Sequence, residues 1–296
     1  MDIQRVTVIG AGTMGNGIAQ TFAQNGFSVT LVDVDSNALE RATGQIGRSL
    51  DRFVKKGQMT ATEREAAMAR IRCETDIEAL TDQHLVVEAV VEDETVKKRV
   101  LNLAQRSLAP HGILASNTSS ISLTRLAAAT AIPTRVVGMH FMNPVPMMEL
   151  VEIVRASQTS PEVVETVVNL CKRLGKTPAE SEDYPGFIAN RILMPMINEA
   201  IQALMEGVGT REAIDTVMKL GMNHPMGPLT LADFIGLDVC LAILEVLHRG
   251  LGDPKYRPCP LLRKMVDAGW LGRKSGRGFY AYTPAPQRAP EAAARG

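Results

Sequence analysis

Residues 5–35, RVTVIGAGTMGNGIAQTFAQNGFSVTLVDVD, decide the fold. The apolar run at 3–9 predicts a buried strand, and a glycine-rich turn follows it directly. The next residues have the pattern of a helix that stops at Gly26, and 28–35 form a second apolar run. A strand, turn, helix and second strand in this order favour a parallel sheet with crossover helices.

The glycines of the turn have the spacing G-x-G-x-x-G at Gly10, Gly12 and Gly15. The first glycine permits the tight turn, the second lets a pyrophosphate approach the backbone, and the third lets the helix pack closely, with its N-terminus toward the phosphates. Asp33 ends the second strand, where a carboxylate can bind the ribose hydroxyls and repel a 2′-phosphate. The pattern therefore predicts dinucleotide binding, with NAD favoured over NADP.

Glycine spacing alone is weak evidence, because a glycine-rich turn with an exposed Asp33 would look the same. The position directly after a strand and before a helix strengthens the prediction. The motif leaves NAD and FAD both open. A helical second domain without flavin features favours the nicotinamide cofactor.

The rest of the chain predicts two domains. Residues 1–183 read as a Rossmann-type α/β domain with a mostly parallel sheet, and a helical hairpin is inserted at about 37–72. Strand signals stop after residue 183, so 184–283 is expected to be an all-helical C-terminal domain. The Pro- and Ala-rich segment 284–296 is expected to be a disordered tail.

Composition narrows the functional class. The 296 residues are 45% hydrophobic and 22% charged, and Lys+Arg and Asp+Glu both number 32. This balance points away from nucleic acid or an anionic membrane as partner, although a local basic patch could still bind an anionic ligand. The four cysteines form no CxxC pair, and the N-terminal residues lack a signal-peptide pattern. We expect a cytoplasmic protein with reduced thiols, no membrane span and no metal site.

The stretch GMHFMNPVPMMELVEIV, residues 138–154, places ionisable side chains in apolar runs. Such groups are costly to bury without a partner. Glu149 and Glu152 are three residues apart, so on a strand they face opposite sides and only one can reach His140. Taken by itself, His140 is more often a hydrogen-bonded core histidine than a catalytic one.

With these motifs, ASNTSS at 115–120 and PGFIANRILMPMINEA at 185–200, the chain resembles the 3-hydroxyacyl-CoA dehydrogenase family. The resemblance runs from residue 3 to 282, and the shorter single-activity bacterial members look closest. It implies an NAD-dependent enzyme that interconverts (S)-3-hydroxyacyl-CoA, with a short acyl chain, and 3-oxoacyl-CoA. It also implies a homodimer formed through the helical domain.

The resemblance further implies the site residues. The catalytic acid–base pair falls on His140 and Glu152, which leaves Glu149 as a surface or structural residue. Ser119 and Asn190 match substrate contacts, and Ser49 and Lys56 match coenzyme A contacts in a region that varies. The expected cofactor contacts are Gly10, Gly12, Thr13, Met14, Gly15, Asp33, Glu92, Lys97 and Asn117.

Simpler explanations exist for several of these residues. Ser119 precedes a helix and could be a cap, and Asn190 could be a polar residue on an apolar helix. Lys55 and Lys56 could belong to a solvated loop. The methionines around the motifs fit an adaptable core, or an acyl pocket.

Two other functions remain open. One is an NAD-dependent dehydrogenase of a free 3-hydroxy acid, although related enzymes of that kind commonly use a catalytic lysine. The other is a non-catalytic NADH-binding structural protein of the same fold. The complete set of Ser119, His140, Glu152 and Asn190 favours the acyl-CoA enzyme.

Overall fold

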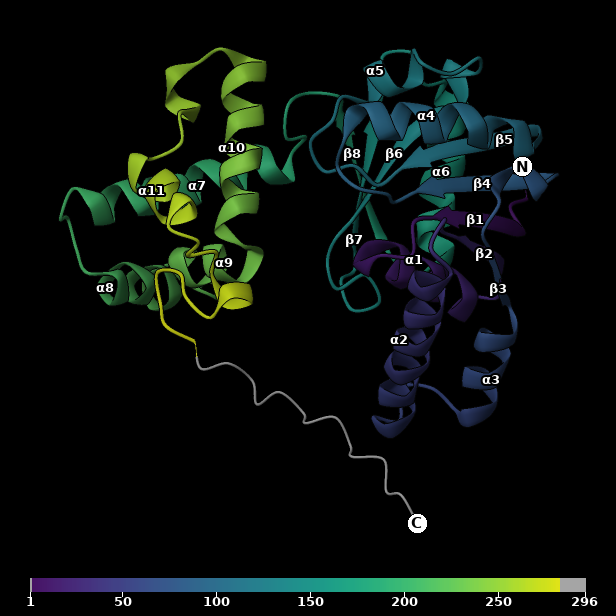
Figure 1. Ribbon diagram of the computed structural model, residues 1–296, viewed down its shortest axis with the longest axis horizontal. Coiled ribbons are helices and arrows are strands. Elements are labelled where there is room, and N and C mark those ends of the chain that lie inside the picture. The colour runs from purple at the N-terminus through teal and green to yellow at the C-terminus, as the bar shows by residue number, and fades with distance from the viewer. Residues whose placement is uncertain (1, 283–296) are drawn as a thin grey trace. The chain divides into compact units, whose positions relative to one another are not determined.

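The computed structural model of the chain describes residues 2–282. The chain divides into two compact units between Phe187 and Ile188. The first unit holds the sheet and its covering helices, and the second is helical (Figure 1).

The first unit is built on one eight-stranded sheet in the order β3-β2-β1-β4-β5-β6-β7-β8. Strands β1 to β6 are parallel, β7 runs antiparallel to β6, and β8 is parallel to β7. The strands are β1 Arg5–Ile9, β2 Ser28–Val32, β3 Ile71–Glu74, β4 Gln83–Glu88, β5 Leu108–Ser116, β6 Val136–Phe141, β7 Leu150–Arg155 and β8 Thr177–Glu182.

Helices cover both faces of this sheet. Helices α1 and α6 pack on one face through a core that includes Phe22 and Val167, and α4 and α5 pack on the other through Leu101 and Leu123. The helices of this unit are α1 Thr13–Gln24, α2 Ser36–Lys55, α3 Ala61–Ala69, α4 Glu94–Ala104, α5 Leu123–Ala127 and α6 Pro161–Arg173. Because both faces are covered, the central strands are mostly apolar, as in β1 and β6.

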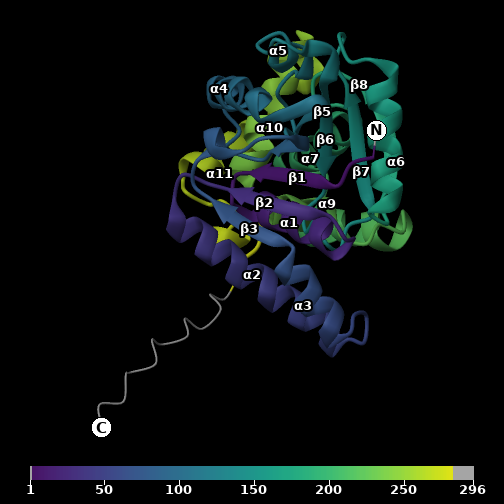
Figure 2. The same ribbon diagram turned by 90° about the vertical axis from the view of Figure 1, so that its right-hand side faces the viewer.

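Helices α2 and α3 form the predicted hairpin, which projects beyond the sheet in both views (Figures 1 and 2). A capping box begins α3, because the Thr60 side chain accepts a hydrogen bond from the Glu63 amide and the Glu63 side chain accepts one from the Thr60 amide. The buried residues of α2 recur with a helical period, so one stripe of the helix enters the core and the rest is solvated.

The sequence pattern does not predict two of the strands, β3 and β8. It predicts helix to about residue 72, but β3 begins at Ile71, and it predicts no strand where β8 lies. Both strands lie at the edges of the sheet, where only one neighbour is paired. Edge strands tolerate charge and proline, so Arg72 in β3 and Pro178 in β8 hide the strand pattern.

The second unit is a helical bundle around its own core. Its helices are α7 Ala189–Met205, α8 Arg211–Thr216, α9 Pro228–Ile235, α10 Leu237–Leu251 and α11 Pro260–Asp267, and α8 continues into a π-helical turn, Val217–Gly221. Its core includes Ile201, Leu229, Leu244 and Leu262.

A buried carboxylate fastens the last described segment to this bundle. Asp233, on α9, accepts hydrogen bonds from the amides of Phe279 and Tyr280, both at 2.9 Å, and from the Tyr282 hydroxyl at 2.9 Å. Gly278 fits only because it lacks a side chain, since a Cβ there would lie 1.8 Å from Asp233 Oδ1. We call Asp233 with residues 278–282 the C-terminal clamp.

The predicted fold class, a Rossmann-type unit followed by a helical one, is confirmed. The predicted disordered tail, 284–296, lies outside the described residues. Among residues 2–282, no helix combines the length and the apolar character needed to cross a membrane.

Candidate active site

The glycine turn between β1 and α1 has the geometry that the spacing predicts. Gly10 has φ +105°, and a Cβ there would lie 2.5 Å from the carbonyl oxygen of Ala89. A Cβ on Gly15 would lie 1.7 Å from the Gly10 oxygen, so helix and turn touch. Among residues 2–282, nothing lies within 4 Å of a Cβ built at Gly12, and no side chain caps the start of α1. The turn therefore presents open space beside a helix N-terminus, which suits a phosphate.

A pocket of about 720 Å³ extends from this turn. Its lining includes Thr13, Asp33, Val34, Val90 and Val91. The Asp33 carboxylate is fixed in the pocket, since its Oδ2 accepts from the Ala11 amide at 2.8 Å and its Oδ1 from the Asp35 amide at 3.0 Å. These residues fit a dinucleotide, with apolar walls for a base and an acid for ribose hydroxyls.

His140 and Glu152 lie directly opposite each other on the antiparallel strands β6 and β7. The His140 Nδ1 is 2.9 Å from Glu152 Oε2, and the two side chains are 9% and 2% exposed. Because a carboxylate accepts, Nδ1 carries the hydrogen and Nε2 keeps its lone pair in the neutral ring. The ring of Phe187 lies edge-on to the imidazole with the centroids 6.0 Å apart.

The loop 142–149 between these strands is held in place by the side chain of Lys176. The buried Lys176 donates hydrogen bonds from Nζ to the carbonyl oxygens of Val145 at 2.8 Å and Met148 at 2.7 Å. Burial lowers the pKa of the Lys176 ammonium. Gly17 of α1 completes the seat, because a Cβ there would lie 2.9 Å from the Val145 side chain.

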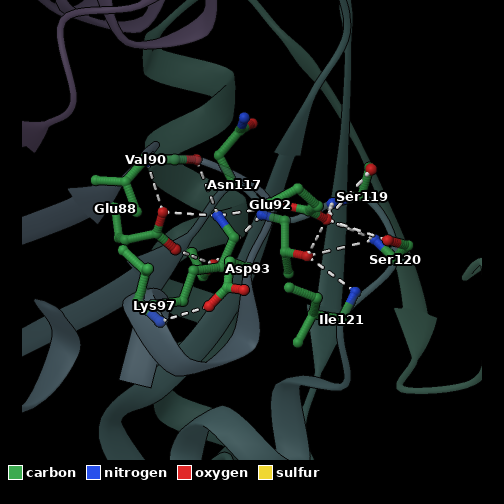
Figure 3. Close-up of polar contacts among 12 residues, drawn as sticks. Glu88, Val90, Glu92, Asp93, Lys97, Asn117, Ser119, Ser120 and Ile121 are labelled. Atoms are coloured by element: carbon green, nitrogen blue, oxygen red, sulfur yellow. Dashed lines mark hydrogen bonds and ion pairs between the residues drawn. The ribbon is translucent and has the colours of Figure 1, made fainter. Parts of the chain in front are cut away.

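A second group of polar residues lies at the carboxyl ends of β4 and β5 (Figure 3). Lys97, 1% exposed on α4, donates to Glu88 Oε1 at 2.7 Å and lies 3.2 Å from Glu92 Oε2. Glu88 is fully buried, and it also accepts from the Val90 amide at 2.7 Å and the Ser116 hydroxyl at 2.6 Å. We call Glu88, Lys97 and Glu92 the ionic cluster.

Glu92 ties this cluster to the loop that follows β5. Its Oε1 accepts from the Thr118 hydroxyl at 2.6 Å, the Ser119 amide at 2.9 Å and the Ser120 amide at 3.2 Å (Figure 3). Partial burial by itself would raise the pKa of the Glu92 carboxyl. The charge of Lys97 and these hydrogen bonds outweigh burial and lower it.

Asn117 joins this loop to the strand of the histidine. Its side-chain Oδ1 accepts a hydrogen bond from the Phe141 backbone amide at 2.9 Å, and its backbone amide donates to the Glu88 carbonyl oxygen at 2.8 Å. Thus Glu88 at the end of β4, Asn117 just after β5 and His140 near the end of β6 lie in succession along the carboxyl ends of three neighbouring strands.

Four of the predicted residues, Glu92, Lys97, Asn117 and Ser119, meet in or beside the ionic cluster. The expectation for Glu149 is confirmed, because it is exposed and precedes β7. Ser49 on α2 and Lys56 at its end make no hydrogen bond to the cluster or to His140 within the described residues. Asn190 is the second residue of α7 and belongs to the second unit.

Sequence reasoning missed Glu88 and Lys176. Glu88 ends the apolar run HLVVE, so the same signal that singled out His140, an ionisable group in a buried strand, was present there. Lys176 carried no such signal, because it follows the end of α6 in a segment that looks like an ordinary surface turn. Its role depends on a loop 28 to 31 residues earlier in the chain.

Comparison with known proteins gives two family matches. Residues 5–184 match the model of the 3-hydroxyacyl-CoA dehydrogenase NAD binding domain, and residues 186–282 match that of the 3-hydroxyacyl-CoA dehydrogenase C-terminal domain. Together they span nearly all described residues.

Individual relatives agree with these matches. A probable 3-hydroxybutyryl-CoA dehydrogenase of Deinococcus radiodurans is 58% identical over 93% of this chain and 99% of its own length. The 3-hydroxybutyryl-CoA dehydrogenase of Bradyrhizobium diazoefficiens is 54% identical over 97% of this chain and 99% of its own. The crystal structure of (S)-3-hydroxybutyryl-CoA dehydrogenase from Ralstonia eutropha superposes with a TM-score of 0.93 at 49% identity, covering 95% of this chain and 100% of that one.

Proposed function

The chain belongs to the 3-hydroxyacyl-CoA dehydrogenase family, and we propose that it interconverts (S)-3-hydroxybutyryl-CoA and acetoacetyl-CoA with His140 and Glu152 as its acid–base pair. The class of the enzyme, an NAD-dependent oxidoreductase of 3-hydroxyacyl-CoA, follows from the family. The short acyl chain and the catalytic residues are our proposal. The observation that carries it is the 2.9 Å contact between His140 Nδ1 and Glu152.

His140 takes up the proton in the direction of oxidation. Its Nε2 keeps a lone pair because Nδ1 is bound to the carboxylate, so Nε2 accepts the hydroxyl proton as the C–H bond breaks. Glu152 holds the ring in this tautomer and stabilises the imidazolium that results. In reduction, the same nitrogen returns the proton to the oxygen.

The cofactor NAD⁺, when bound, accepts the hydride that leaves the substrate carbon. The residues proposed to hold it are the glycine turn with Thr13 and Met14, Asp33 at the ribose, and Glu92, Lys97 and Asn117 along the edge of β4 and β5. The open space at Gly12 and the fixed carboxylate of Asp33 support this assignment.

Ser119 and Asn190 are proposed to hydrogen-bond the reacting oxygen. Both side chains are neutral, so they can stabilise a developing negative charge without competing with His140 for the proton. Glu92 supports the role of Ser119, since it fixes the backbone of that loop.

Ser49 and Lys56 are proposed to bind the coenzyme A moiety. Lys56 is exposed at the C-terminal end of α2, where Arg52 and Lys55 add to the positive charge. Lys56→Ala is expected to raise KM for the acyl-CoA several-fold at low ionic strength and less at high salt, because exposed charges are screened. An unchanged KM at low salt would remove Lys56 from the site.

The domain boundary near residue 184, the location and the assembly are also part of the proposal. We expect a cytoplasmic homodimer formed through the helical domain. The large apolar side chains exposed on the second unit, including Val208, Leu220 and Met222, support such an interface. Sedimentation of the protein should give twice the mass of one chain, and a monomer at micromolar concentration would contradict it.

One assay separates the proposal from its rivals. NADH oxidation is measured with acetoacetyl-CoA, with longer 3-oxoacyl-CoAs and with free acetoacetate. We expect the highest kcat/KM with acetoacetyl-CoA and negligible turnover of the free acid. Preference for the free acid would identify a 3-hydroxy acid dehydrogenase, and NADH binding without turnover would identify a structural protein.

A further inference from the structure

The hydrogen bonds of the ionic cluster fix the charges of its members. Lys97 Nζ faces three acceptors, namely Glu88 Oε1, Glu92 Oε2 and the Val90 carbonyl oxygen at 3.4 Å, so all three of its hydrogens are used and it is an ammonium. A neutral lysine could not serve this arrangement.

Glu88 is surrounded by donors. Its Oε1 accepts from Lys97 and from the Val90 amide, and its Oε2 from the Ser116 hydroxyl. The Ser116 oxygen itself accepts from the Thr118 amide at 3.3 Å, which leaves its hydrogen to point at Glu88. A carboxyl with donors on both oxygens is ionised.

Glu92 is ionised for the same reason, since its Oε1 receives one hydroxyl and two backbone amides. The cluster therefore holds two carboxylates and one ammonium, a net charge of −1. Glu88 and Lys97 are buried, so water screens this charge less than it screens the surface pairs around Glu94, where Lys98 and Arg125 add the opposite sign.

The cluster lies between the glycine turn and the histidine. Glu88 and Ser116 are the last residues of β4 and β5, and β4 pairs with β1, which leads into the glycine turn. Beyond the cluster, Asn117 contacts β6 next to His140. A dinucleotide that reaches from the turn to His140 crosses this edge, the usual binding crevice of such a sheet.

Within the cofactor, only the nicotinamide ring changes charge in the reaction, since it is cationic in NAD⁺ and neutral in NADH. We propose that the net charge of the Glu88–Lys97–Glu92 cluster, in which Glu88 and Lys97 are buried, favours NAD⁺ over NADH and so sets the ratio of their two dissociation constants. The proposal rests on the proposed function in one respect, that the reacting ring lies between the turn and His140. Glu88 is thus a residue that discriminates the redox state of the cofactor, acting through charge.

The test is the ratio of Kd for NAD⁺ to Kd for NADH, which needs no turnover. NADH binding is followed by its fluorescence and NAD⁺ binding by displacement of NADH. Glu88→Gln keeps the size of the side chain, and its amide can donate to Ser116 Oγ, so Lys97 and Val90 retain their acceptor. We expect the ratio to rise roughly five- to twentyfold, mainly through weaker NAD⁺ binding, the order of effect expected when one poorly screened unit charge is removed.

Glu94→Gln is the matched control. It removes the same charge at a partly exposed, salt-bridged position on α4, the helix of Lys97, and the ratio should stay unchanged. Glu92→Gln should raise the ratio as Glu88→Gln does, and it carries the test if Glu88→Gln does not fold. A ratio that stays constant in the cluster variants, including equal weakening of both forms, would overturn the proposal. Failure of the unaltered protein to bind either form would instead contradict the cofactor assignment, and this inference with it.

Discussion

At the residue scale, the tautomer of His140 is decided by what touches Nδ1. Sequence reasoning could place His140 and Glu152 on two apolar runs, but not the pairing of those runs. A shift of one residue would turn Glu152 to the other face of the sheet. The register that sets His140 opposite Glu152 comes from the packing of both strands, which is why the resemblance and not the spacing selected Glu152 over Glu149.

Glu152→Gln tests the pair. Glutamine keeps the size and one hydrogen bond but loses the charge that stabilises the imidazolium, so kcat should fall roughly 10²-fold or more. NADH binding should stay within about twofold.

His140→Gln should lose at least as much, and the double variant should lose much less than the product of the two single losses. Near-normal kcat in Glu152→Gln, or fully multiplicative losses, would mean that Glu152 is structural. Glu149 would then be the first alternative partner to test.

Asp33 decides between the two nicotinamide cofactors. Asp33→Asn keeps an acceptor for the Ala11 amide but removes the charge that repels a 2′-phosphate. The preference for NAD over NADP, measured as the ratio of kcat/KM values, should fall about tenfold. Asp33→Ala should also weaken NAD binding. An unmodified enzyme that works equally well with NADPH would refute the role.

At the scale of elements, the central strands and the larger helices were predictable because their apolar residues form short runs in the strands and recur with a helical period in the helices. Edge strands β3 and β8 were not, since none of their residues is buried and their sequences are largely polar. The ionic cluster was predictable only in part. It forms where β4, α4 and the loop after β5 come together, and no local sequence pattern predicts that these three segments are in contact.

Lys176→Met tests the seat of the loop 142–149. The substitution keeps the length of the side chain but leaves the carbonyl oxygens of Val145 and Met148 without their donor. Unmet buried acceptors cost about 1–3 kcal/mol, so the free energy of unfolding should fall by about that amount. The loop joins the strands of His140 and Glu152, so kcat should fall as well.

Lys172→Met, an equal charge change at an exposed position on α6, is the control for both measurements. If Lys176→Met and Lys172→Met had the same free energy of unfolding and the same kcat, the hydrogen bonds of Lys176 to the loop would contribute nothing beyond its charge. A loss of stability without a loss of kcat would separate the seat from catalysis.

At the scale of the whole molecule, each unit has its own core and its own buried carboxylates. Asp215 accepts from the Leu229 and Thr230 amides and from the Tyr280 hydroxyl, and Asp233 holds the C-terminal clamp. Burial raises the pKa of the Asp233 carboxyl. The helical unit was predictable from apolar periodicity, but the clamp was not, because it depends on a partner far along the chain.

Alkaline unfolding should report on the clamp. Burial, with the hydrogen bond to Asp233, raises the pKa of Tyr282 to about 12, above its value near 10 in an unfolded chain. A raised pKa stabilises the fold below about pH 10, and this contribution is lost as the pH rises toward 12. Tyr282→Phe should therefore unfold more easily at pH 8, and the difference from the unaltered protein should shrink as the pH rises.

Urea unfolding midpoints between pH 8 and 11.5 provide the measurement. Tyr184→Phe, which removes a hydroxyl that is largely exposed, should show no pH-dependent difference. A gap between Tyr282→Phe and the unaltered protein that is constant with pH would exclude proton linkage at Tyr282.

The C-terminal clamp also affects when the protein can fold during its synthesis. The backbone amides that donate hydrogen bonds to Asp233 belong to residues 46 and 47 positions later in the chain. While the chain is still being synthesised, the helices around Asp233 can emerge from the ribosome, but their closing segment is still inside it. A chain whose synthesis stops before Phe279 would keep a bare carboxylate and an open core, which chaperones and proteases can detect. The clamp therefore cannot close until the chain through Tyr282 has left the ribosome.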